Sequence, residues 1–209
     1  MPSYKLVYFD LRARAEPVRI MFELAGVKYE DVRIPFGSEE WQKMKPTIGL
    51  GQVPVLEVDG KEMPQSGAIY RYVAREHGMI PLDSWEIAQM DVVIETVKDM
   101  APGMGKVFLE KDPAKKEFAT EGCQPVLNNM EKLLKKNNGG AGWFVGDKIT
   151  LADVLAFSMV HDAIPPLIGV EPGDLSYMKS QDALKAFVDR FKVEPKVAAW
   201  LQKRPKNVF

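Results

Sequence analysis

The chain has 209 residues, 46% of them apolar and 27% charged, which are the proportions of a globular protein and not of a disordered one. Its 28 basic and 29 acidic residues are interspersed and leave a formal net charge of -1, so we expect no nucleic-acid partner and no attraction to anionic membranes. The first residues lack the apolar core of a signal peptide, and no stretch is long enough to span a bilayer, which together predict a cytoplasmic protein.

The beginning of the chain alternates between strand-like and helix-like patterns. Residues 4–9 are rich in aromatic and β-branched residues, which predicts a strand. A helix then opens around residues 12–17, with Pro17 suited to its first turn, and Gly26 stands where a C-terminal cap is expected. Residues 29–34 predict a second strand. The segment is therefore a βαβ unit.

The next fifty residues complete a mixed α/β unit. A looser, glycine-punctuated stretch leads to residue 51, and two short strands around residues 53–58 and 61–63 flank Asp59-Gly60, a dipeptide that favours the tight turn of a hairpin. Residues 66–78 predict a helix. We therefore place an α/β domain of βαβ-ββα order at residues 1–80.

From residue 81 onward the apolar spacing is only helical. The expected helices cover residues 87–109, 114–136, 151–164 and 183–191. Thr150 and Asp153 form a capping-box pattern before the third of these helices, which is a structural signal. We assign residues 81–209 to an all-helical domain.

The single cysteine limits the chemistry of the chain. Cys123 cannot form an internal disulfide, a CxxC redox pair or a cysteine metal site, and we expect it to be a buried apolar residue and predict no metal site. The βαβ-ββα order is also that of a thioredoxin-type oxidoreductase, but no cysteine lies near the first helix, where such an enzyme carries its nucleophile. Any thiol chemistry must therefore use a thiol that is brought in.

The order of motifs resembles the glutathione transferase superfamily over essentially the whole chain. The run Tyr8-Phe9-Asp10-Leu11-Arg12-Ala13-Arg14-Ala15-Glu16-Pro17-Val18-Arg19 is similar to the N-terminal signature of the sigma class and its nu-like relatives. The resemblance implies a thioredoxin-like N-terminal domain that binds glutathione and an all-helical domain that contributes the acceptor pocket. It also implies a homodimer, glutathione as co-substrate and no tightly bound cofactor.

Glutathione carries two carboxylates, an ammonium and a thiol, and the sequence offers a partner for each. Ser66 starts a helix after Gln65, where free amides and the helix dipole favour the γ-glutamyl carboxylate. The other glutathione-binding residues expected with Tyr8, Gln65 and Ser66 are Trp41, Lys45, Gln52, Val53, Pro54 and Asp99. The resemblance implies a cis Val53–Pro54 bond that lets the Val53 backbone pair with the peptide, and an Asp99 that reaches glutathione in the neighbouring subunit.

Tyr8 is the expected catalytic residue, assisted by Arg14. The thiolate is the nucleophile, yet a free thiol of pKa near 8.5 is mostly protonated at neutral pH. Lowering that pKa by about two units requires roughly 2.7 kcal/mol of preferential stabilisation of the anion. One hydrogen bond to a charged group is worth about 1.5–3 kcal/mol, so a donating Tyr8 hydroxyl could supply much of it without ionising.

The acceptor pocket is expected between the two domains, where apolar side chains can hold a hydrophobic electrophile beside the sulfur. Its candidate residues are Phe9, Leu11, Ala13, Met104, Leu155, Met159 and Phe209. Ala13 departs from the family pattern, which has glycine there, and we expect it to narrow the pocket. His77 and His161 are assigned no role.

Two further readings compete with detoxification of electrophiles by conjugation. The first is a carrier of haem-like or other apolar ligands, or a structural protein such as those of the lens. The second is glutathione-dependent prostaglandin isomerisation, with peroxide reduction as a further family activity. Retention of Tyr8 and the short connection around residues 111–113 favour an enzyme over a structural protein.

Overall fold

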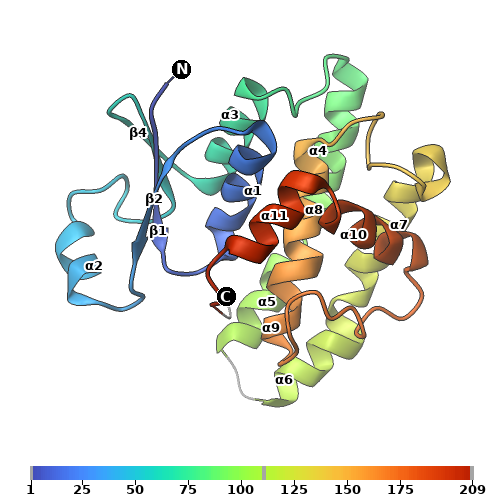
Figure 1. Ribbon diagram of the computed structural model, residues 1–209. Coiled ribbons are helices and arrows are strands. Elements are labelled where there is room, and N and C mark those ends of the chain that lie inside the picture. The colour runs from blue at the N-terminus through green and yellow to red at the C-terminus, as the bar shows by residue number, and fades with distance from the viewer. Residues whose placement is uncertain (1, 110–111, 208–209) are drawn as a thin grey trace.

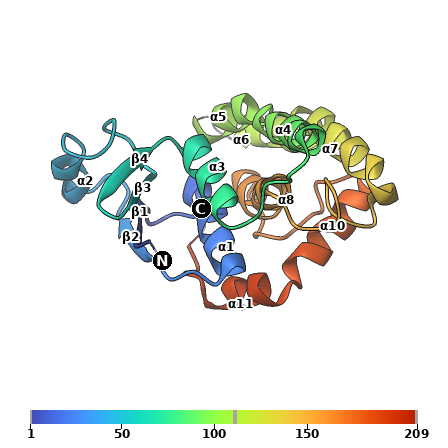
Figure 2. The same ribbon diagram turned by 90° about the horizontal axis from the view of Figure 1, so that it is seen from above.

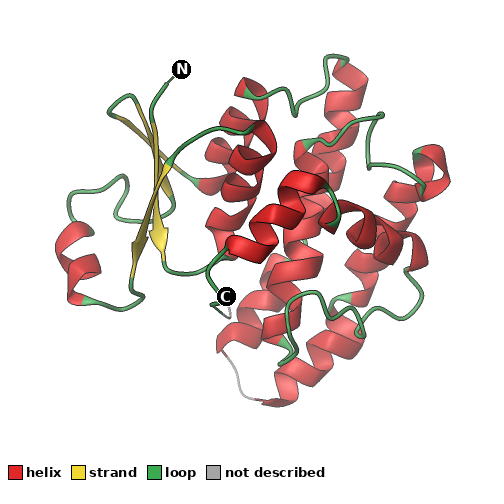
Figure 3. Cartoon of the chain, viewed as in Figure 1, coloured by secondary structure: helices red, strands yellow, loops and turns green. Residues whose placement is uncertain are grey.

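The computed structural model describes residues 2–109 and 112–207. Figure 1 shows a small sheet at one side of the molecule and a larger group of helices at the other, and Figure 3 shows that the strands are confined to the sheet side. Within the described residues, no helix is both long enough and apolar enough to cross a bilayer.

A four-stranded mixed sheet forms the first part of the chain. The strands are β1 (Tyr4–Phe9), β2 (Glu30–Ile34), β3 (Val55–Val58) and β4 (Lys61–Pro64), in the order β2-β1-β3-β4. β1 runs parallel to β2 and antiparallel to β3, and β3 and β4 form the antiparallel hairpin predicted from Asp59-Gly60. The predicted βαβ-ββα order, and with it the thioredoxin-like fold, is confirmed.

Helices lie on both sides of this sheet. α1 (Glu16–Ala25) and α3 (Ser66–Glu76) separate it from the C-terminal helices, whereas α2 (Glu39–Met44) lies on the far side (Figures 1 and 2). Alternate β1 residues follow this division, because Leu6 and Tyr8 belong to the main core, whereas Val7 packs with Trp41 of α2 in a smaller cluster.

Helices joined by loops make up the second part of the chain, and none of its described residues lies in a strand. Its helices are α4 (Ser84–Lys98), α5 (Ala101–Leu109), α6 (Asp112–Glu117), α7 (Gln124–Lys136), α8 (Leu151–Phe157), α9 (Ile164–Leu167), α10 (Asp182–Lys192) and α11 (Pro195–Lys203). α8 lies at the centre of this group in Figure 2, and every one of its residues is buried. α8 packs against α1, and this contact joins the two parts of the chain.

The long helices predicted in this part are interrupted. The helix expected at residues 87–109 is divided into α4 and α5, and α4 begins earlier because the Asp83 carboxylate accepts the amides of Trp85 and Glu86 at 2.9 and 3.0 Å. π-helical turns follow α6 (Phe118–Gly122) and α8 (Ser158–Ala163). α2 and α11 were not predicted.

The capping box before α8 is present as expected. Asp153 is fully buried and accepts three hydrogen bonds of 2.8 Å, from the amide of Phe144 and from the amide and hydroxyl of Thr150. Burial is the largest influence on this carboxyl and raises its pKa to about 6, although the three donors act in the opposite direction. Asp153 therefore ties the start of α8 to the preceding loop.

Candidate active site

Tyr8 lies near the carboxyl end of β1, where the chain leaves the sheet toward α1. Its side chain is 6% exposed, and burial raises the pKa of its hydroxyl above the usual 10. A hydrogen bond from the Arg14 amide and the positive charges of Arg14 and Arg19 act in the opposite direction. The phenol is therefore uncharged at neutral pH. Because its oxygen accepts the Arg14 amide, its own proton is available to a further acceptor.

The loop between β1 and α1 surrounds the Tyr8 hydroxyl. Ala13 has a positive φ of 32°, in the region that favours glycine, and Arg14 is exposed. The hydroxyl of Tyr70 donates to the Arg14 carbonyl at 2.7 Å. Tyr70 also hydrogen-bonds the Ser66 side chain, and burial raises the pKa of Tyr70. Tyr8, Arg14, Ser66 and Tyr70 are thus brought together.

The start of α3 combines free amides with a strained backbone. Gln65 has φ 76° and ψ 107°, which is unusual for a residue other than glycine. No side chain caps the helix at this position, and the Ala68 amide bonds to the Gln65 carbonyl at 3.0 Å, so the amides of Ser66 and Gly67 are those available to an anion. Strain of this kind persists at functional sites when the surrounding structure imposes it. Ser66 is the first residue of α3 and directly follows Gln65, as predicted.

The chain enters β3 through a cis peptide bond between Val53 and Pro54. Pro54 is buried, Val53 is half-buried and Gln52 is exposed. The cis bond was implied by the resemblance and is present.

Trp41 and Lys45 occupy α2 and the residue that follows it, and they differ in environment. The Trp41 ring is 9% exposed and packs edge-on against Phe9, with the ring centroids 5.2 Å apart. Lys45 is exposed. The structure therefore places Trp41 in the smaller core and Lys45 at the surface. The loop after Lys45 is attached to the β3–β4 hairpin by a hydrogen bond of 2.9 Å from the Gly49 amide to the Glu62 carboxylate.

The predicted acceptor-pocket residues differ in their exposure. Leu155 is buried in the main core, while Ala13 is exposed and Phe209 lies outside the described residues. The half-buried side chains that pack against this core are Phe9, Leu11, Met104 and Met159. Asp99 is exposed just after the end of α4.

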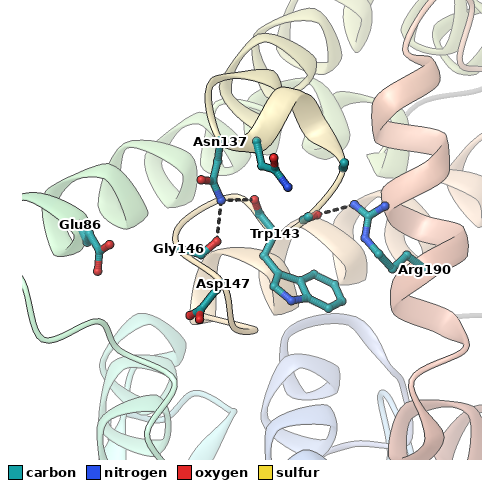
Figure 4. Close-up of a pocket in the computed structure, with 9 residues that line it drawn as sticks. Glu86, Asn137, Trp143, Gly146, Asp147 and Arg190 are labelled. Atoms are coloured by element: carbon teal, nitrogen blue, oxygen red, sulfur yellow. Dashed lines mark hydrogen bonds between the residues drawn. The ribbon is translucent and has the colours of Figure 1, made fainter.

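A pocket of about 600 Å³ lies elsewhere, between the start of α4, the loop after α7 and α10. Figure 4 shows Glu86, Asn137, Trp143, Asp147 and Arg190 around it. Its lining combines charged and amide side chains with the Trp143 ring and includes none of the predicted site residues. In the described part of the chain, no group of three or more His, Cys, Asp or Glu residues could hold a metal ion.

Sequence reasoning missed Tyr70 and a group of buried charges beside the Tyr8 loop. Tyr70 is four residues after Ser66, on the same side of a predicted helix, so its spacing was an available signal. Arg19 lies in the helix predicted after Pro17 and is completely buried, although its side chain is charged. Asp162 and Arg204 are 42 residues apart and carry no sequence signal of their contact.

Comparison with known proteins identifies relatives over the full length. Residues 4–75 match the family described as glutathione S-transferase, N-terminal domain, and residues 98–204 match glutathione S-transferase, C-terminal domain. The chain is 39% identical over 212 residues to hematopoietic prostaglandin D synthase of Gallus gallus and 36% identical over 214 residues to S-crystallin SL11 of Nototodarus sloanii, with 100% of each chain covered. The crystal structure of the glutathione S-transferase from Ascaris lumbricoides superposes with a TM-score of 0.85 at 31% identity, again over 100% of both chains.

Proposed function

The chain belongs to the glutathione S-transferase family, and from that premise we propose that it is a sigma-like enzyme that conjugates glutathione to hydrophobic electrophiles. The observation that carries the proposal is the environment of Tyr8, a buried and uncharged hydroxyl whose oxygen already accepts the Arg14 amide. The hydroxyl proton of Tyr8 is therefore free to be donated to an incoming anion, and the glutathione thiolate is such an anion.

Tyr8 would act as a hydrogen-bond donor to the glutathione sulfur. A donor of this kind stabilises the thiolate relative to the thiol, and the roughly 1.5–3 kcal/mol of a charged hydrogen bond matches a lowering of one to two pKa units. Arg14 adds positive potential, and the Tyr70 contact at its carbonyl holds the amide that orients Tyr8. The thiolate then attacks the electrophile, the new carbon–sulfur bond forms, and the leaving group departs.

The other expected residues would hold the peptide. Ser66 and the free amides at the start of α3 would bind the γ-glutamyl carboxylate, with Gln65 beside them. Val53, next to the cis bond, would pair with the glutathione backbone, and Gln52 would add a side-chain contact. Lys45 and Trp41 would meet the glycyl carboxylate.

A homodimer would complete the site through Asp99. Trp85, Val92 and Asp99 follow one another at seven-residue spacing, so they share one side of α4 and its end. Trp85 is 71% exposed and Val92 is 44% exposed, and large apolar side chains exposed together mark a contact surface. A second subunit seated on this side would bring Asp99 toward the glutamyl ammonium of its glutathione.

The acceptor pocket would lie beside Tyr8 and be lined by half-buried apolar side chains of both parts of the chain, such as Leu11, Met104 and Met159. Such a lining fits hydrophobic electrophiles and a role in cytoplasmic detoxification.

Prostaglandin isomerisation is the second candidate. One relative, 39% identical over the whole length, is a prostaglandin D synthase, and that reaction would use the same Tyr8 and the same thiolate.

The proposal is tested by turnover of chlorodinitrobenzene with glutathione, measured for the wild type and Tyr8→Phe, together with retention of both on glutathione resin. Both proteins should bind the resin, and the variant should lose most of its turnover. Failure of the wild type to bind would show that the glutathione site is wrong. Binding by both without turnover by either would instead favour ligand carriage or isomerisation.

A further inference from the structure

A cluster of buried charges joins the C-terminal helices to α1. Asp162, in the π-helical turn after α8, is 4% exposed and accepts hydrogen bonds from both terminal nitrogens of Arg204, at 3.1 and 2.7 Å. Arg204 also donates to Glu16 of α1 at 2.7 Å. Glu16 receives a further bond, from the Trp200 indole at 2.9 Å, and pairs with Arg19 at 3.3 Å. The cluster therefore spans both parts of the chain.

Arg12 connects this cluster to the loop that carries Arg14. It is 6% exposed, although it lies between the half-buried Leu11 and the exposed Ala13. One of its terminal nitrogens lies 3.6 Å from Asp162, and the other donates to the Asn207 carbonyl. Burial and the neighbouring Arg204 lower the pKa of Arg12, and Asp162 opposes both effects. Asp162 thus lies beside two buried guanidinium groups.

Hydrogen bonds hold the loop between β1 and α1 at several of its carbonyl groups. Arg19 donates to the Leu11 carbonyl at 2.8 Å, and Tyr70 donates to the Arg14 carbonyl at 2.7 Å. The Arg12 carbonyl accepts the amides of Ala15 and Glu16 at 3.1 and 3.0 Å, which starts α1. Arg12 lies between the fixed carbonyls of Leu11 and Arg14, two residues before the amide that bonds to Tyr8.

We propose that Asp162 is a positioning residue for thiol activation: it holds Arg12 from the helical side, and through Arg12 it sets the Arg14 amide against the Tyr8 hydroxyl. This inference rests on the proposed function. Without the Asp162 charge, Arg12 and Arg204 are two neighbouring buried cations for which Glu16 is the shared carboxylate, and Glu171 adds its charge at Arg12 alone. Arg12 then gains by turning toward water, since an unpaired buried charge is unfavourable, and the loop moves with it.

The π-helical turn supplies a reason for the placement of Asp162. A π-helical turn adds a residue to the helix, which rotates the side chains that follow, and such turns are frequent at functional sites. In this turn, Ser158–Ala163, His161 stacks on Phe157 with ring centroids 4.6 Å apart, and its Nδ1 lies 3.0 Å from the Asp162 carboxylate. Asp162 is therefore held from both sides while it faces Arg12.

The experiment measures the pKa of the glutathione thiol in the enzyme complex, from the ultraviolet absorbance of the thiolate as pH is varied. The variants are Asp162→Asn, which keeps the shape and removes the charge, and Arg12→Lys, which keeps the charge but not the planar group. The matched control is Glu131→Gln. Glu131 is also a buried carboxylate of the helical part, but it accepts the amides of Ala183 and Leu184, at 3.2 and 2.8 Å, far from the loop.

Asp162→Asn and Arg12→Lys should both raise the thiol pKa by about half a unit to one unit. Because the wild-type thiol pKa is expected to be about 6.5, the thiolate fraction at pH 7, and with it kcat/KM, should fall roughly 1.5- to threefold, with a nearly unchanged glutathione Kd. Glu131→Gln should lower the Tm and leave the thiol pKa unchanged. A wild-type thiol pKa in folded Asp162→Asn would overturn the inference, as would an equal shift in Glu131→Gln. If Asp162→Asn does not fold, Arg12→Lys decides by the same criterion. If the wild type itself shows no lowered thiol pKa, the proposed function fails and the inference with it.

Discussion

Replacing Asp153 by alanine tests whether one buried carboxylate holds the start of α8. The substitution removes the acceptor of three hydrogen bonds of 2.8 Å, two of them from the amides of Phe144 and Thr150, which are themselves 3% and 5% exposed. A buried donor left without a partner costs about 1–3 kcal/mol, so the two amides together predict a loss of roughly 2–6 kcal/mol. That is a large part of the 5–15 kcal/mol typical of a folded domain.

Thr150→Ala is the matched comparison, because it removes only the hydroxyl donor and leaves the Asp153 carboxylate with both amides. Its expected cost is about 1 kcal/mol. The assay is urea unfolding followed by tryptophan fluorescence and circular dichroism at one fixed protein concentration, since a dimer unfolds in a concentration-dependent way. A cost below about 1 kcal/mol for Asp153→Ala, or equal costs for the two variants, would refute the reasoning.

Three further predictions concern the loop, its contact with α3 and the pH dependence of stability. Ala13→Gly should stabilise the protein by about 0.5–1 kcal/mol in urea unfolding, because relief of the positive φ outweighs the entropy that glycine loses; a destabilised variant would contradict this. Tyr70→Phe removes the 2.7 Å bond to the Arg14 carbonyl, and kcat/KM should fall about fivefold in steady-state turnover, whereas an unchanged value would show that this bond does not orient the loop. Burial raises the pKa of Asp153 to about 6, so the stability that this pKa shift contributes is complete below about pH 4 and is lost as pH rises through 6. Urea titrations of the wild type and Asp153→Asn should therefore show the stability difference between them shrinking over that interval, and a constant difference would be evidence against the shift.

The sheet and the helices α1 and α3 were predictable because their signals are local. The strand pattern of residues 4–9, the Asp59-Gly60 turn and the Gly26 cap each depend on neighbours in sequence, and all three are present. The start of α3 at Ser66 was predicted for the same reason.

The interruptions of the C-terminal helices were not predictable from periodicity. In α7, Pro125 lies in the first turn, and the Cys123 amide bonds to the Phe118 carbonyl at 3.0 Å, five residues back. The apolar residues keep helical spacing both before and after such a π-helical step, so the sequence pattern predicts one continuous helix. α2 was missed because it is short and depends on the Ser38 cap, which accepts the Trp41 amide at 3.2 Å.

In the candidate site, too, some features are predictable from local sequence and others are not. Tyr8, Gln65 and Ser66 stand in motifs that are read along the sequence, whereas the contacts of Asp162 with Arg12 and Arg204 join distant segments. The positive φ values of Ala13 and Gln65 are set by the surrounding fold and not by these residues' own preferences. Sequence alone therefore indicates which residues could act on a thiol, and the structure adds the contacts that orient them.

The central claim is that the Tyr8 hydroxyl lowers the pKa of the glutathione thiol, and a pH titration of thiolate absorbance in the wild-type and Tyr8→Phe complexes tests it most directly. The wild-type complex should show a thiol pKa about two units below that of free glutathione, and the variant complex should show most of that shift removed while still binding glutathione. The same lowered pKa in both complexes would contradict the account and assign thiol activation to another group.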